Sequence, residues 1–146
     1  RELEEWAAPI LASLKPAERA QLARKIGMDL RRGQIQRIAQ QRNPDGSPYA
    51  PRKQQAREKA GRIKRGAMFK KLRQPRFLKL RTSADEAVIE FASRVTKIAR
   101  IHHEGQRAEV RPDGPVIRYA RRELLGFSAA DRERIRQLVL DHLGGA

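Results

Sequence analysis

The side chains with the clearest potential for chemistry are two adjacent histidines followed by an acid, in the string His102-His103-Glu104-Gly105. Adjacent residues on a helix point about 100° apart, so the two imidazoles are poorly placed to share one metal ion. The third histidine of the chain is His142, and there is no cysteine. The string therefore favours a local structural role, such as closing the end of a helix at Gly105, over a metal site.

No other arrangement typical of an enzyme is present in the sequence. No serine lies in a Gly-x-Ser-x-Gly string, and the glycines Gly61 and Gly66 lack the Gly-Lys-Ser/Thr ending of a phosphate-binding loop. The absence of cysteine excludes a disulfide framework, a thiolate zinc site and a cysteine nucleophile. We therefore expect no enzyme and no catalytic, cofactor-binding or metal-binding residues. A hydrolase that uses His102 or His103 is the least favoured alternative.

The positive charge of the chain is concentrated in one stretch. The chain carries 33 Lys and Arg against 17 Asp and Glu, a net charge of +16. Residues 42–81 hold 14 of these bases and only two acids, Asp45 and Glu58. Residues 42–67 begin with turn residues and contain few large apolar side chains, which predicts a long basic arm within a single domain of residues 1–146. The arm would lie between a helical N-terminal part and an α+β core. The bases expected to contact a partner or an anion are Arg52, Lys53, Arg57, Lys59, Arg62, Lys64, Arg65, Lys70 and Lys71.

A basic stretch of this kind attracts polyanions, and two classes of partner remain open. Few aromatic residues lie near it, and no pattern for base recognition surrounds it, so a contact with DNA would be with the backbone and nonspecific. An acidic protein surface is the other class. A free-standing nonspecific nucleic-acid-binding protein that uses residues 42–81 is the alternative function. No apolar run reaches the roughly 20 residues of a membrane span, so no membrane partner is expected.

The spacing of apolar residues predicts the elements around the arm. The expected order is a helix over residues 3–14, a longer helix over 16–41, a hairpin of strands 77–82 and 87–92, a short helix ending at Gly105, a second hairpin of strands 108–110 and 116–119, and a last helix capped by Ser128 with Asp131 at the capping-box position. Because strands occur only in hairpins, the order predicts an α+β fold in which antiparallel hairpins form a small sheet.

The longer helix carries two apolar lines. Leu22, Ile26 and Leu30 lie on one side with a period of 3.6 residues. Met28, Ile35 and Ala39 form a second line on nearly the opposite side. One core needs one such line, so the second predicts another contact, either with the N-terminal helix or with a neighbouring subunit. These last three residues are the candidate subunit contacts.

Four strings in the sequence, in their order and spacing, resemble the virion morphogenesis or tail completion family of contractile-tailed phages and prophages. The strings are LKPAER at 14–19, RNPDGSPY at 42–49, IARIHHEG at 98–105 and RYARRELLGFS at 118–128. They span nearly the whole chain. The motif residues for which the resemblance implies a structural role are Pro44, Asp45, Gly46, Tyr49, His102, Gly105, Leu125, Gly126 and Ser128.

The resemblance implies a structural protein of the virion neck. Such a protein would oligomerise as a ring, with six subunits expected, at the head-proximal end of the tail and would enable head–tail joining. Its partners would be other copies of itself and other neck, tail tube or sheath, and connector proteins, with nonspecific contact to genomic DNA as a further expectation. It would be found in the virion tail or neck, and in the host cytoplasm during assembly. The family offers no catalytic residues.

Overall fold

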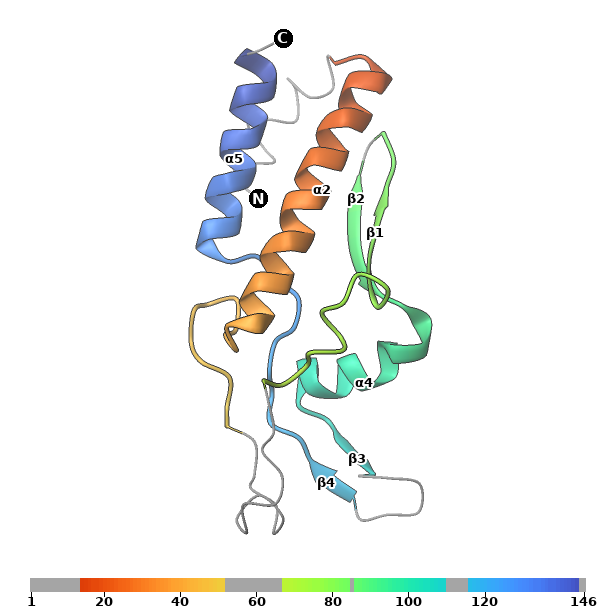
Figure 1. Ribbon diagram of the computed structural model, residues 1–146, viewed down its shortest axis with the longest axis vertical. Helices are drawn as coiled ribbons and strands as arrows, with labels where there is room; N and C mark the ends of the chain where they lie inside the picture. Colours follow the sequence, from red (N-terminus) through yellow and green to blue (C-terminus); the bar gives the residue numbers. More distant parts are fainter. Residues whose placement is uncertain (1–13, 52–66, 85, 110–115, 145–146) are drawn as a thin grey trace.

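The computed structural model describes residues 14–51, 67–84, 86–109 and 116–144, and for Ile117 only the backbone (Figure 1). In chain order the described elements are α2 (Pro16–Ala39), β1 (Leu78–Thr82), β2 (Ala87–Phe91), α4 (Ser93–Glu104), β3 (Arg107–Glu109), β4 (Val116–Arg118) and α5 (Ala129–Gly144). The predicted α+β class is confirmed. The helix expected over residues 3–14 lies outside the described residues.

Helix α2 is the longest element and runs through the middle of the molecule (Figure 1). Pro16 stands at its start, where the missing N–H of proline costs nothing, and Glu18 lies in its first turn. The helix ends at Ala39, two residues before the predicted end, because Gln41 adopts a left-handed conformation with φ of 59°. The chain therefore turns sharply at the point where the predicted arm begins.

Helix α2 packs between helix α5 on one side and the β1–β2 hairpin on the other (Figure 1). Leu22 and Leu30 form a buried cluster with Ile135 and Val139 of α5, so the first predicted apolar line does face a core. On the hairpin side, a Cβ atom at Gly27 would lie 2.5 Å from Leu80 Cδ1. The glycine thus allows the hairpin to approach the helix closely.

Both predicted hairpins are present, and they form two separate two-stranded sheets rather than one. In the first, Leu78 pairs with Phe91 and Thr82 with Ala87, and a four-residue connection joins the strands as expected. In the second, Arg107 pairs with Arg118. Within the described chain the hairpins therefore do not share a sheet; α4 connects them in sequence.

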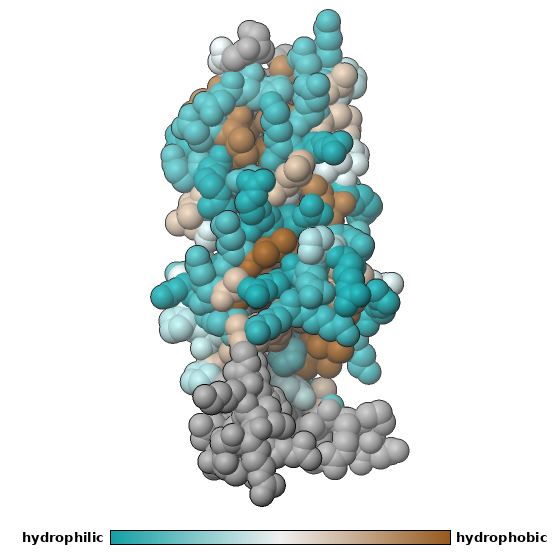
Figure 2. All heavy atoms as spheres, in the orientation of Figure 1, coloured by the Kyte–Doolittle hydropathy of each residue, from teal (hydrophilic) through white to brown (hydrophobic). Residues whose placement is uncertain are grey.

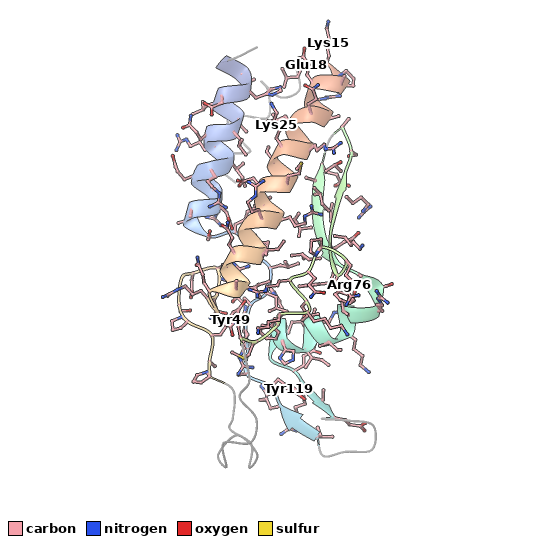
Figure 3. The ribbon with its side chains drawn as sticks, viewed as in Figure 1. Lys15, Glu18, Lys25, Tyr49, Arg76 and Tyr119 are labelled. Atoms are coloured by element: carbon pink, nitrogen blue, oxygen red, sulfur yellow. The ribbon has the colours of Figure 1, made fainter. Side chains whose placement is uncertain are left out.

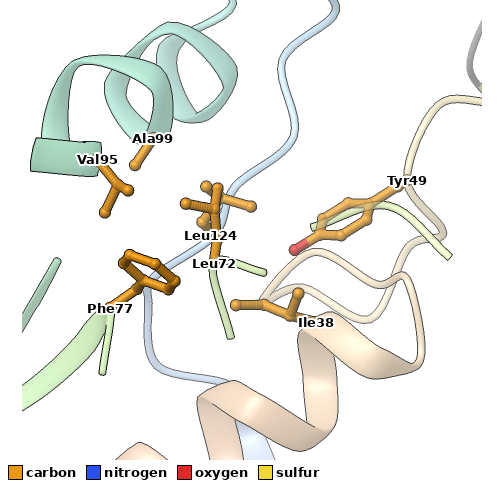
Figure 4. Close-up of a cluster of buried hydrophobic side chains, with 7 residues drawn as sticks. All are labelled: Ile38, Tyr49, Leu72, Phe77, Val95, Ala99 and Leu124. Atoms are coloured by element: carbon orange, nitrogen blue, oxygen red, sulfur yellow. The ribbon is translucent and has the colours of Figure 1, made fainter. Parts of the chain in front are cut away.

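The larger hydrophobic core lies between the end of α2 and α4, where several irregular segments meet (Figure 4). Its buried residues are Ile38, Tyr49, Leu72, Phe77, Val95, Ala99 and Leu124. Four of the seven come from segments outside any helix or strand, namely Tyr49, Leu72, Phe77 and Leu124. Because such segments cannot satisfy their own backbone polar groups, side chains must do so.

The surface is mainly hydrophilic, and in the face shown in Figure 2 apolar side chains appear in small separate groups. The large apolar residues with the most exposure are Met28, Ile98, Val116, Phe127 and Leu140. None of the helices described is long and apolar enough to cross a membrane.

Candidate functional site

Residues 120–128, which we call the junction segment, pass below the end of α2 and lead into α5 (Figure 1). The segment forms no helix or strand. Even so, four of its backbone N–H groups donate hydrogen bonds to earlier parts of the chain. The pairs are Arg122 N with His102 O (2.8 Å), Glu123 N with Asn43 Oδ1 (2.8 Å), Leu124 N with His103 Nδ1 (3.1 Å) and Gly126 N with Gln34 Oε1 (3.1 Å). The segment is therefore fixed by contacts that come from α2, α4 and the turn after α2.

The guanidinium of Arg37 supplies the matching donors for the carbonyl groups of this region. Its Nη1 donates to the backbone oxygens of Arg42 and Glu123, both at 3.0 Å. Its Nη2 donates to Leu124 O at 2.7 Å and to Gln34 Oε1 at 2.6 Å. Arg37 is only 7% exposed, and the several donors of a guanidinium allow one side chain to serve all of these acceptors. Arg37 thus joins α2 to the turn and to the junction segment.

The same network continues into α5 through a buried carboxylate. Asp131 is 2% exposed and forms the predicted capping box with Ser128, with Asp131 N donating to Ser128 Oγ at 3.0 Å and Ser128 N to Asp131 Oδ2 at 3.1 Å. Gln34 Nε2 donates to Asp131 at 3.4 Å, and Arg134 pairs with both Asp131 and Asp29. Gln34 therefore links Arg37 to the carboxylate by hydrogen bonds, while Arg134 supplies the positive charge that pairs with Asp131.

Residues 42–48 form a closed turn. Asn43 N donates to Ser47 O at 2.8 Å, and Gly46 has a φ of 92°, which favours glycine. Asp45 accepts hydrogen bonds from the backbone and the hydroxyl group of Ser47, and these bonds lower the pKa of the Asp45 carboxyl. The turn holds Asn43 in position to accept its bond from the junction segment.

Two glycines permit close approaches to the junction segment. A Cβ atom at Gly126 would lie 2.6 Å from Pro44 Cγ, so the turn and the segment touch at this point. Gly105 ends α4 with a φ of 69°, and a Cβ atom there would lie 3.1 Å from the backbone N of Arg121. Larger residues at either position would push the segment away from its partners.

An aromatic row runs beside the junction segment and includes the two tyrosines labelled in Figure 3. The ring centroids are 5.7 Å apart between Tyr49 and Phe69, 5.0 Å between Phe69 and His102, and 4.9 Å between His102 and Tyr119, all edge-to-face. The Tyr49 hydroxyl donates to Glu123 O at 2.9 Å, and burial raises its pKa, so it remains a donor. Phe69 has a φ of 66°, an uncommon conformation that this packing must hold in place.

The residues on either side of 52–66 are both fixed to the body. Before this stretch, Arg122 donates to Ala50 O at 2.8 Å and to Pro51 O at 3.2 Å. After it, the Gln41 amide makes a reciprocal pair with the backbone of Met68, at 2.9 and 2.7 Å. We call residues 49–51 and 67–69 the arm base; the rings of Tyr49 and Phe69 bring its two halves together. The described residues on the two sides of 52–66 therefore lie together at one place on the body.

At this junction the structure brings together three of the four strings on which the family resemblance rests. A comparison with protein-family models finds the same family. The model described as the phage virion morphogenesis family matches residues 1–144. The chain belongs to the phage virion morphogenesis family. Tail completion protein S of Escherichia phage P2 is 41% identical to this family member over 145 residues, which cover 98% of this chain and 96% of that protein. No solved structure matches this chain.

In this family member, most of the motif residues named from the sequence lie at the junction. Pro44 and Gly126 touch, Tyr49 and His102 belong to the aromatic row, and Ser128 begins α5. Leu125 lies beside them and lines a shallow, open pocket between β2 and α4. The contacts of these residues serve the fold, and no group of three or more His, Asp or Glu side chains able to hold a metal lies within the described ranges.

The other predicted contact residues are placed only in part. Lys70 and Lys71 are exposed, whereas the basic residues from Arg52 to Arg65 lie outside the described residues. Met28 is 42% exposed, and Ile35 and Ala39 are half-buried. The subunit contact and the anion contact therefore stay predictions.

Sequence reasoning missed the polar residues that build the junction. Gln34 and Arg37 follow Leu30 at intervals of four and three residues, so they extend the helix face that packs into the core. A polar residue on such a face is the signal that could have identified them, because a buried amide or guanidinium needs partners. Asn43 gave no comparable signal, since asparagine in a turn is usually satisfied locally.

Replacing Arg37 with leucine should lower the free energy of unfolding by about 3 kcal/mol, because three backbone carbonyl groups, in the turn after α2 and in the junction segment, lose a charged donor. Urea denaturation followed by circular dichroism measures the change. The matched control is Arg32→Leu, an exposed position on the same helix, which should change stability by less than about 0.5 kcal/mol. Equal losses in the two variants would contradict the role given to Arg37.

The stability of the protein should fall as the pH drops below about 6.5, the pKa of an unfolded histidine. Burial, and then the nearby Arg122 charge, lower the pKa of His102, so the folded state favours the neutral imidazole and the unfolded state binds the proton more readily. His102→Phe should flatten this part of the profile, measured as the free energy of unfolding across the range. Tyr119→Phe leaves the imidazole in place and should keep the wild-type slope; a His102→Phe protein with that same slope would refute the assignment.

Proposed function

We propose that this protein is a structural subunit that completes the phage tail at its head-proximal end and so enables the head to join. The observation that carries the proposal is its 41% identity, over nearly the full length of both chains, to a protein named for tail completion. The geometry supports a structural role as well, because the described motif residues and their neighbours make hydrogen bonds that join the segments of the body. A rigid body with a basic stretch at a fixed base suits a part that fits between two preformed assemblies.

The subunits would assemble as a ring that matches the symmetry of the tail, and six is the expected number. Met28, Ile35 and Ala39 lie seven and four residues apart, so they share one face of α2. This face differs from the two that pack inside the molecule, because Leu22 and Leu30 face α5 and Gly27 faces the β1–β2 hairpin. The exposed Met28 on this face suits a contact between copies.

The basic stretch would bind neighbouring virion proteins in the neck, tail tube, sheath or connector. It holds seven Lys and Arg and one acid between residues 52 and 66, and the arm base fixes where it leaves the body. Contact with genomic DNA is the second candidate, favoured by the same charge. Because phage DNA must slide past the neck, strong lumenal binding would oppose ejection, so we place the protein contact first.

The proposed function is tested with particles made in the absence of this protein. We expect such lysates to contain heads and unjoined tails, and purified protein to restore complete particles, counted by negative-stain electron microscopy. A variant with the seven bases of 52–66 replaced by serine should keep the circular dichroism spectrum but fail to restore joining. The control exchanges Lys for Arg and Arg for Lys in the same stretch and should restore it, because the charge is retained. Normal assembly without the protein would contradict the function.

The predicted subunit contact is tested by Met28→Glu, which places a charge on the proposed contact face and should shift the protein to monomers. Light scattering coupled to gel filtration measures the mass. The matched control is Leu140→Glu on α5, which introduces the same charge at a side chain of similar exposure, 45% against 42%, and should leave the mass unchanged. If both variants or neither variant dissociate, the face named here is wrong.

A further inference from the structure

Three cationic side chains surround one buried aromatic ring. Phe77 is 3% exposed, and the charged groups of Lys71, Arg76 and Arg94 lie 5.4, 4.6 and 5.0 Å from its ring centroid. Because each charged group lies within 5.4 Å of the same ring centroid, any two of them are at most about twice that distance apart. Figure 3 shows Arg76 where the base of the hairpin meets the start of α4. We call the three residues the Phe77 cation cluster.

The cluster has no acidic partner among the described residues. The ion pairs found there involve Arg81, Arg121 and Arg134, and the nearest one along the chain, from Arg81 to Glu90, lies farther up the hairpin. The negative face of the ring attracts cations and offsets part of their mutual repulsion. It leaves their net charge unchanged, and all three side chains are exposed. The ring therefore gathers positive charge at one fixed place without neutralising it.

An apolar side chain lies on the same flank of α4. Ile98 is 52% exposed and follows Arg94 by four residues, so the two share a helix face. Val95 and Ala99, on the adjacent face, are buried in the larger core. Arg76 Nε donates to Gln74 Oε1, but none of the three cations pairs with an acid that the structure describes. The surface thus combines three such cations with an exposed isoleucine on a well-packed support, and arginine beside an apolar group is characteristic of protein contacts.

We propose that the Phe77 cation cluster and Ile98 form a docking surface for an acidic segment of another virion protein, one that presents carboxylates on either side of an apolar side chain. The identity of the partner as a virion protein rests on the proposed function; the chemistry of the surface does not. The guanidinium groups of Arg76 and Arg94 are held against the ring, which orients them in advance for carboxylates. A phosphate backbone would use the same charges but would gain nothing from Ile98.

The test measures binding of three labelled probes to the full chain by fluorescence anisotropy. The probes are a glutamate-rich peptide with a central leucine, the same peptide with alanine instead, and a short DNA duplex. The variant Lys71→Gln/Arg76→Gln/Arg94→Gln removes the cluster. The control Arg24→Gln/Arg132→Gln/Arg136→Gln removes the same charge from exposed positions on α2 and α5. The variant Ile98→Ala removes only the apolar group.

We expect the cluster variant to bind the leucine peptide at least about tenfold more weakly than wild type, and the control variant to bind it within about threefold. Ile98→Ala should weaken the leucine peptide and leave the alanine peptide and the DNA unchanged. Equal losses in the cluster and control variants would overturn the proposal, because general charge would then explain the binding. A loss of DNA binding alone would assign the surface to a nucleic acid instead and would also overturn it.

Circular dichroism and thermal melting check each variant first. If the cluster variant is unfolded, Lys71→Arg/Arg76→Lys/Arg94→Lys keeps the charge and should bind the leucine peptide, and Ile98→Ala still decides between protein and DNA. Because no tails or heads are used, a negative result here leaves the joining experiment unaffected, and a failure of joining leaves this result standing.

Discussion

A buried guanidinium holds together the parts of this chain that have no helix or strand of their own. The donors of Arg37 reach backbone oxygens in the turn after α2 and in the junction segment, and also an amide of its own helix that passes the interaction on to Asp131. Without these bonds Leu124 O would lose its charged donor and Glu123 O would keep only the Tyr49 hydroxyl, at a cost that apolar packing would have to offset. The aromatic row and the arm base lie against the same segments, because the Tyr49 hydroxyl shares Glu123 O with Arg37.

The basic side chains that give the chain its net charge of +16 lie in different environments. Arg37 is buried and hydrogen-bonded to carbonyl groups of the fold, and Arg122 fixes the arm base. Lys71, Arg76 and Arg94 gather on Phe77 and meet no acid in the described part of the molecule. The net charge therefore does not describe one uniform basic surface. It combines structural cations with exposed ones, and only the exposed ones are available to a partner.

Much of the fold could be predicted from the sequence, because it follows local rules. Apolar spacing and turn residues predicted α2, both hairpins, α4 with its end at Gly105, and the capping box of α5. Two features could not be predicted in this way. The separation of the hairpins into two sheets depends on where α4 leads the chain. The junction depends on contacts between residues as far apart as Arg37 and Leu124, which no periodicity reveals. The four strings identified the family without showing that three of them meet.

The hydrogen bonds of the junction segment predict that it is rigid although it has no regular secondary structure. Amide hydrogen exchange tests it most directly, because the N–H groups of Arg122, Glu123, Leu124 and Gly126 each donate to a partner outside the segment. We predict that these four amides are protected to a degree similar to those in the middle of α2, and that Arg37→Leu removes their protection before that of α2. Exchange as fast as in an unstructured loop, in the wild-type protein, would contradict the account.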